Sequence, residues 1–134
     1  MKAYITCPVS HTKNRLLLLP KIEKIVQSAG IETFVFKIGG TPTEIFNRDY
    51  NQLKSCDLLI AEVSETSHGV GIEIGLSFCF DLERILLFEK GQKVTKLAQG
   101  MPNTTLIEYE NLKDLQTKLI IQLTKYKKYS HKLE

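Results

Sequence analysis

Three carboxylates stand out because of where they lie in the chain: Asp49, Glu62 and Glu73. Asp49 is four residues from both Ile45 and Leu53, so it shares a helix face with apolar residues. A carboxylate on a core-facing side is costly unless it has a partner or a function. Glu62 ends a strand-like run, and Glu73 follows the next loop. Acids gathered near one loop predict chemistry at an acetal-like carbon, where one acid attacks and another handles protons.

The loop and helix start at residues 61–75, AEVSETSHGVGIEIG, predict a ligand-binding turn. Ser67, Gly69 and Gly71 supply a hydroxyl and closely approachable backbone before a helix expected to begin near Gly71. Free N–H groups at a helix N-terminus favour an anion, so these three residues are predicted to bind substrate. Glu73 would then lie in the first helical turn, where the dipole favours the ionised carboxylate that nucleophilic attack requires.

Each of these residues also has a simpler structural role open to it. Ser67 could cap the helix, and Glu62 could cap the loop that follows it. Asp49 could be a structural residue at the edge of the apolar stripe, and Glu73 an ordinary helix residue. Tyr4, in the first predicted strand, is expected to border the same crevice, although a buried tyrosine is usually part of the core.

Strand-like and helix-like segments alternate along the whole chain, which predicts one domain over residues 1–134. The expected fold is α/β: a Rossmann-like or flavodoxin-like, doubly wound, five-stranded parallel sheet with helices on both faces. Such sheets bind ligands just outside the carboxyl ends of their strands. Strands are expected at 3–7, 33–36, 58–61, 85–88 and 105–108, and helices at 14–29, 42–55, 71–82 and 111–127.

The composition is that of an ordinary soluble protein, with 43% hydrophobic and 25% charged residues. No apolar run approaches the roughly 20 residues that span a bilayer, and the first residues are too quickly polar for a signal peptide. We therefore expect a cytoplasmic protein with no membrane partner. The basic tail is expected to be a solvated helix end rather than a nucleic-acid site. Its lysines are Lys125, Lys127, Lys128 and Lys132.

Cys7, Cys56 and Cys79 all lie in apolar stretches and form no CxxC pair. None has a histidine at the spacing of a zinc site. They are predicted to be buried apolar residues, without a disulfide or a metal.

The order of several motifs resembles that of the nucleoside 2-deoxyribosyltransferase superfamily, which includes the 2'-deoxynucleoside 5'-phosphate N-hydrolases. The motifs are Tyr4, Arg48-Asp49, Cys56-Asp57, AEVS at 61–64 and Ser67-x-Gly-Val-Gly-x-Glu73-x-Gly75. The match runs from the first strand to about Phe88.

The resemblance implies a Rossmann-like homodimer, or a dimer of dimers, that breaks N-glycosidic bonds without a metal or organic cofactor. Glu73 would be the nucleophile that forms a covalent glycosyl-enzyme, Asp49 would protonate the leaving base, and Tyr4 would position the nucleophile. The 5' end of the nucleoside or nucleotide would be held by Ser67 and Gly69, with Glu62 near the sugar.

The loop after the first strand differs from the family pattern. It reads Cys7-Pro8-Val9-Ser10, where phosphohydrolase members usually carry a Gly-Ser pair. Ser10, Lys13 or Arg15 could replace that pair as ligands of a 5'-phosphate.

Several functions remain open on the sequence. The sugar could pass to water, as in an N-hydrolase, or to another base, as in a deoxyribosyltransferase. A non-catalytic nucleotide-binding or sensing domain of the same fold is the alternative from another class, although three acids near an anionic ligand would not help a pure binder. A flavin carrier is disfavoured, because no aromatic pair that would stack on a flavin is evident. The 89–103 loop could be a lid or a subunit contact.

Overall fold

A computed structural model describes residues 1–133, with side chains as far as Tyr126. Five strands form one sheet in which every neighbouring pair is parallel. This confirms the predicted fold, and the strand order is the flavodoxin-like one. Across the sheet the strands are β2 (Glu32–Val35), β1 (Lys2–Thr6), β3 (Leu58–Glu62), β4 (Glu83–Glu89) and β5 (Thr104–Tyr109).

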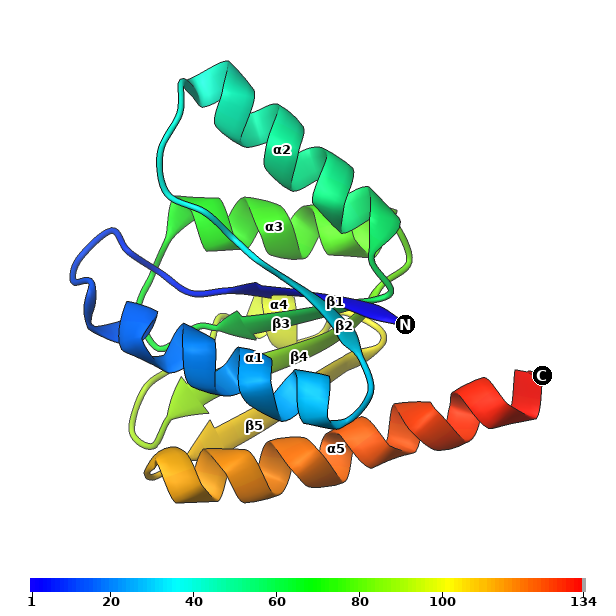
Figure 1. Ribbon diagram of the computed structural model, residues 1–134. Helices are drawn as coiled ribbons and strands as arrows, with labels where there is room; N and C mark the ends of the chain where they lie inside the picture. Colours follow the sequence, from blue (N-terminus) through cyan, green and yellow to red (C-terminus); the bar gives the residue numbers. More distant parts are fainter. Residues whose placement is uncertain (134) are drawn as a thin grey trace.

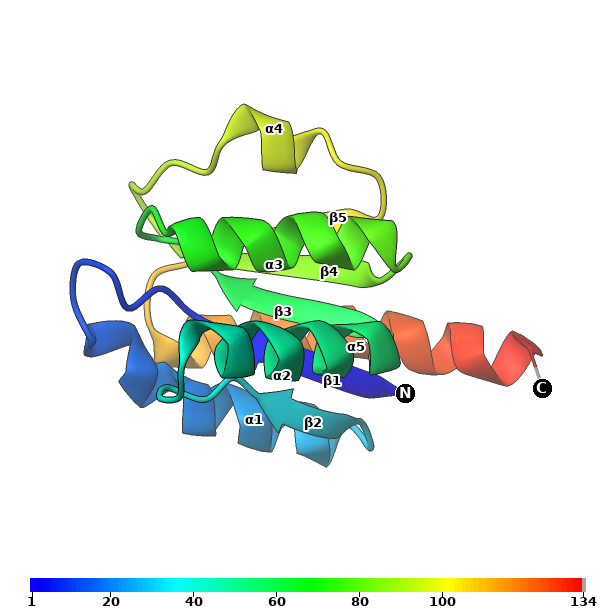
Figure 2. The same cartoon turned by 90° about the horizontal axis from the view of Figure 1, so that it is seen from above.

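Helices cover both faces of the sheet (Figures 1 and 2). One face carries α1 (Leu19–Ser28) and α5 (Leu112–Leu133), and the other carries α2 (Pro42–Ser55) and α3 (His68–Cys79). The short α4 (Lys96–Gln99) lies beyond α3 in the segment between β4 and β5. Because strand residues alternate between faces, each face has its own apolar core.

Local sequence signals set where the first helices begin. α2 starts at a complete capping box: the Thr41 hydroxyl accepts a hydrogen bond from the Glu44 N–H, and the Glu44 carboxylate accepts one from the Thr41 N–H. The predicted helix at 14–29 is instead a 3-10 turn, η1 (Asn14–Leu18), followed by α1. Pro20 explains this start, because proline fits the first turn of an α-helix but not its interior.

α3 begins at His68, three residues earlier than predicted. Its N-cap is Ser67, whose hydroxyl accepts a hydrogen bond from the Val70 N–H at 3.3 Å. The simpler structural role considered for Ser67 is therefore present. The earlier start also puts Glu73 beyond the first helical turn, so the prediction that placed it there is wrong.

A buried arginine that the sequence analysis missed ties α3 to β5 near the amino ends of the strands. Arg84 is 1% exposed and sits on the α2/α3 face of β4. Its guanidinium donates to the Ser77 hydroxyl at 3.2 Å, the Leu82 carbonyl at 2.9 Å and the Thr104 hydroxyl at 3.0 Å, and also to the Pro102 carbonyl. These acceptors satisfy a charge that would otherwise be costly to bury.

Cys7 and Cys56 are buried as predicted, but Cys79 is exposed, because it ends α3 on the side turned away from the sheet. None of the helices within residues 1–133 is long and apolar enough to cross a membrane. Lys127, Lys128 and Lys132, on which the prediction of a solvated basic tail depends, lie outside the residues whose side chains the structure describes.

Candidate active site

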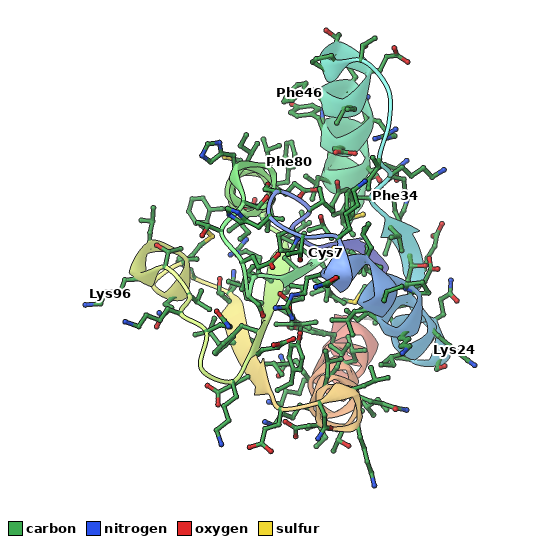
Figure 3. The ribbon with its side chains drawn as sticks, turned by 90° about the vertical axis from the view of Figure 1, so that its left-hand side faces the viewer. Cys7, Lys24, Phe34, Phe46, Phe80 and Lys96 are labelled. Carbon is green, nitrogen blue, oxygen red and sulfur yellow. The ribbon has the colours of Figure 1, made fainter. Side chains whose placement is uncertain are left out.

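A cavity of about 460 Å³ opens at the carboxyl edge of the sheet, between the end of β1, α2 and α3. Figure 3 shows Cys7 near the end of β1, with Phe46 above it on α2. Apolar and aromatic side chains make up most of the wall, and the polar groups come from β1, the segment after β2, α2 and α3. The apolar and aromatic lining includes Val9, Phe36, Ile38, Ile45, Phe46, Tyr50, Ile72 and Leu76, and the polar lining Thr6, Lys37, Asp49, Ser67, Gly69 and Glu73.

Glu73 is the buried acid of this cavity. Its side chain projects from α3 and is buried, with 8% of the residue exposed. One carboxylate oxygen accepts a hydrogen bond from the Thr6 hydroxyl at 3.1 Å, and the other is buried without a partner among the described residues. Burial raises the pKa of Glu73 to about 7, against the opposing effect of the Tyr4 and Thr6 hydroxyls and with a contribution from Asp49.

The prediction that the helix dipole keeps Glu73 ionised is therefore wrong. The physical reason is position: Glu73 lies past the first turn of α3, and desolvation there disfavours the charged form. An acid that titrates near neutrality is ionised in a large fraction of molecules at pH 7. It is also less well solvated than an exposed carboxylate, which leaves it available to a ligand.

Tyr4 lies behind Glu73 rather than in the cavity. It is fully buried, and its hydroxyl has no hydrogen-bond partner among the residues that the structure describes. Successive side chains of a strand point to opposite faces, so Tyr4 and Thr6, two residues apart on β1, lie on the same face, toward α3. Burial and the charges of Glu73 and Asp49 raise the pKa of Tyr4 far above its usual value, so the hydroxyl stays protonated. Tyr4 can therefore donate toward the carboxylates.

Asp49 lines the same cavity from α2, and its side chain is 18% exposed. The Nε of Arg48 lies 3.4 Å from its carboxylate, while the other guanidinium nitrogens donate to the carbonyls of Lys37 and Gly39. The structure thus brings Asp49 and Glu73 into one cavity, as their sequence positions predicted. It also supplies the partner that a half-buried carboxylate needs.

Glu62 does not join them, so the expectation that three carboxylates converge is wrong. Residues alternate along β3, and Glu62 points to the α1/α5 face, opposite to Glu73. Its carboxylate accepts from the N–H and the hydroxyl of Ser64 and from the Tyr109 hydroxyl. The loop-capping role considered for Glu62 is the one that the structure shows.

The predicted substrate-binding residues of the β3–α3 loop are divided between two hollows. Ser67 and Gly69 line the cavity that holds Glu73. Gly71 instead faces a second hollow, of about 670 Å³, between α3 and the segment before α4, and Ser67 lines both. Sequence reasoning could not separate them, because the turn of α3 decides which side each residue faces.

Of the cations proposed for a 5'-phosphate, Arg15 is already engaged. Its guanidinium pairs with Glu89 and lies 3.7 Å from Glu62, on the far face of the sheet. Lys37 lines the cavity instead. No signal in the sequence distinguished these two residues, since the difference depends on which loop folds over which face.

A flavodoxin-like sheet with a buried carboxylate in the lining of an aromatic-walled cavity defines an α/β protein with a candidate site for a small organic ligand. Similar proteins and solved structures indicate which class of ligand and chemistry to consider.

The chain is 28% identical over 132 residues to a protein of Thermofilum pendens named "Putative 2'-deoxynucleoside 5'-phosphate N-hydrolase 1". The match covers 89% of this chain and 92% of that protein. A protein of Syntrophotalea carbinolica with the same name is 34% identical over 73 residues, or 53% of this chain and 51% of that one. No family model matches the chain.

Two solved structures share the fold. A Clostridium botulinum CMP N-glycosidase superposes with a TM-score of 0.69 at 24% identity, over 89% of this chain and 98% of that one. A 2-deoxyribosyltransferase of Bacillus psychrosaccharolyticus gives 0.68 at 17% identity, over 87% and 90%. These relatives and neighbours confirm the resemblance to the nucleoside 2-deoxyribosyltransferase superfamily. All four carry the names of enzymes.

Proposed function

We propose that the protein cleaves the N-glycosidic bond of a 2'-deoxynucleoside or its 5'-monophosphate through a covalent glycosyl-enzyme on Glu73. The observation that carries the proposal is the unpaired carboxylate oxygen of Glu73, buried at the wall of a cavity that Asp49 also lines. A buried oxygen without a partner is costly unless a ligand completes it. The names of the relatives point to the same bond.

The chemistry needs two acids in different protonation states. In the first step an oxygen of ionised Glu73 bonds to the anomeric carbon while the C–N bond breaks. The bonding pair goes to the base nitrogen, which a proton from the Asp49 carboxyl neutralises. In the second step a water, or the nitrogen of a second base, attacks the same carbon, and Asp49 takes its proton. Glu73 leaves, so the configuration at the anomeric carbon is retained overall.

The other site residues bind and orient in this proposal. Thr6 holds the Glu73 carboxylate by a hydrogen bond, and Tyr4, whose protonated hydroxyl lies behind it, orients it. Ser67 and Gly69, at the N-terminus of α3, hold the 5' side of the sugar. The aromatic and aliphatic wall encloses the base and excludes water from it.

The direct test is a panel of 2'-deoxynucleosides and ribonucleosides with their 5'-monophosphates, each incubated with and without a second free base. Chromatography of the released base and rapid-quench peptide mass spectrometry would detect turnover and a glycosyl adduct on Glu73. Exchange into the second base identifies a transferase, and release alone identifies a hydrolase. If no panel member reacts, calorimetric binding of the same panel would favour the non-catalytic alternative.

The pH dependence follows from the burial of Glu73. Attack requires the ionised form, so the acid limb of kcat/KM should rise about tenfold per pH unit and bend at an apparent pKa of about 7. The measurement should use an unphosphorylated nucleoside where one is cleaved, because a phosphate titrates near pH 6. Carbon-13 NMR of the Glu73 carboxyl in the free protein gives the matching pKa. A rate that stays level down to pH 5 would contradict the role of Glu73.

We also propose that the protein is a homodimer formed through the outer side of α3. This helix is apolar around its circumference, with Ile72 and Phe78 about half exposed. Gly75 has no atom within 4 Å of the place where a Cβ would stand, so no described part of the same chain packs closely against it. A second copy of the chain would cover this surface.

Gly75→Lys should convert such a dimer to a monomer without harming the fold, because the position is open and lysine favours a helix more than glycine does. Sedimentation velocity would measure the change, with Ile121→Lys on the exposed side of α5 as the matched control. A wild-type protein that sediments as a monomer at every concentration would contradict the proposal.

A further inference from the structure

On the α1/α5 face of the sheet, at the carboxyl ends of the strands, lies an ionic network that no step of the proposed reaction uses. Glu62 is completely buried, and Arg15 is largely buried beside it. Their nitrogen and oxygen atoms lie 3.7 Å apart, and Arg15 also pairs with Glu89. Tyr109 donates its hydroxyl to Glu62. The network therefore joins η1 to the carboxyl ends of β3, β4 and β5.

The network ends on the loop that carries Ser67. The Glu62 carboxylate accepts from the Ser64 N–H at 2.6 Å and from the Ser64 hydroxyl at 2.9 Å. The same hydroxyl accepts from the Glu89 N–H at 2.8 Å, so Ser64 is held from two strands. One residue further, the Glu65 carboxylate accepts from the Thr12 hydroxyl at 3.0 Å. Two consecutive loop residues are thus fixed just before the helix N-cap.

A buried ionic network contributes little net stability, because desolvation offsets most of the attraction. Its hydrogen bonds instead select one conformation of the groups that they hold. Here those groups belong to the β3–α3 loop, whose next residues line the cavity on the opposite face. The network can therefore hold the loop in the conformation that binds a ligand before the ligand arrives.

From this geometry we infer that Arg15, Glu62 and Tyr109 are positioning residues that set the β3–α3 loop for binding the 5' side of the substrate. The inference rests on the proposed function, because it assigns the binding loop of that site. In this inference Glu62 does not contact the sugar but acts on the loop from the opposite face of the sheet. Loss of the network should weaken substrate binding and leave the chemical step at Glu73 and Asp49 largely intact.

The test compares two buried arginines, Arg15 and Arg84, each replaced by methionine. Arg15→Met and the milder Tyr109→Phe should raise KM about tenfold or more with kcat nearly unchanged, for the panel substrate that is cleaved fastest. Arg15→Lys should recover part of the loss. Arg84→Met, whose contacts lie at the other end of the strands, should lower the melting temperature without raising KM.

Hydrogen exchange of the free protein supplies a readout that needs no turnover. Amides of residues 64–70 should exchange at least about tenfold faster than in the wild type in Tyr109→Phe and Arg15→Met. In Arg84→Met they should exchange at the wild-type rate. An unchanged KM in both network variants, a fall in kcat at constant KM, or unchanged exchange in this loop would overturn the inference. A wild-type protein that cleaves nothing would overturn the proposed function instead, and the exchange experiment would still decide the positioning role.

Discussion

Glu73→Gln is expected to reduce base release by roughly 10⁴-fold or more, because the substitution removes the atom proposed to bond to the anomeric carbon. Glutamine keeps the size of the side chain and an oxygen that can accept from Thr6. The loss should therefore fall on kcat, with substrate binding retained. Initial rates of base release by chromatography, with the adduct search repeated on the variant, would measure it.

Glu32→Gln is the matched control, since Glu32 is an exposed acid at the opposite end of the sheet and should keep full activity. Residual activity of Glu73→Gln within tenfold of the wild type would contradict the nucleophile assignment. Retained activity in Glu73→Gln would leave general acid chemistry by Asp49 alone as the better account.

The same substitution should stabilise the fold at high pH. Glu73 has a pKa of about 7 in the folded protein against an ordinary value of 4.5. Between these values the unfolded chain loses its proton first, so the wild type loses stability as the pH rises and the loss is complete above pH 7. Glutamine avoids this loss in the free energy of unfolding, which is about 3 kcal/mol. Urea unfolding at pH 8.5 and pH 4 should show a difference at pH 8.5 that vanishes at pH 4.

Asp49→Asn is expected to lower kcat about 10²–10⁴-fold on ordinary bases, because the amide cannot protonate the departing nitrogen. A base that already carries a positive charge needs no such proton. We therefore expect the deficit to shrink strongly for a 7-methylguanine nucleoside or nucleotide, which leaves as a neutral molecule. Single-turnover base release with the two kinds of substrate would measure the difference.

Asp81→Asn supplies the control, because Asp81 is exposed in a turn after α3 with φ of 59°, a conformation that asparagine also tolerates. An Asp49→Asn deficit that is equal for both substrates would contradict the acid role and indicate that Asp49 acts through binding or through Arg48. A deficit in Asp81→Asn would show that the effect is not specific to the site.

Much of the site was predictable because its signals are local. The cap at Thr41 and the helix phase of Asp49 depend on residues a few positions away, and the structure has both. The start of α3 was misjudged because the glycines after Ser67 resemble a loop, while the Ser67 cap and the packing of Val70 hold them in a helix. Arg84 and Tyr109 gave no signal, and Arg15 was considered only as a phosphate ligand, since the partners of all three are distant in the chain.

The sequence by itself determined the α/β fold, the parallel sheet and the edge where ligands bind, because alternating apolar periods and caps are written into short segments. It also placed Asp49 and Glu73 together, since each follows or faces the end of a strand. The tertiary structure decided which face each acid occupies and how strongly it is desolvated. Those properties depend on side-chain alternation across β3 and on burial by α2 and α3. They separate Glu62, which holds the loop, from Glu73, which lines the cavity and has one carboxylate oxygen without a partner among the described residues.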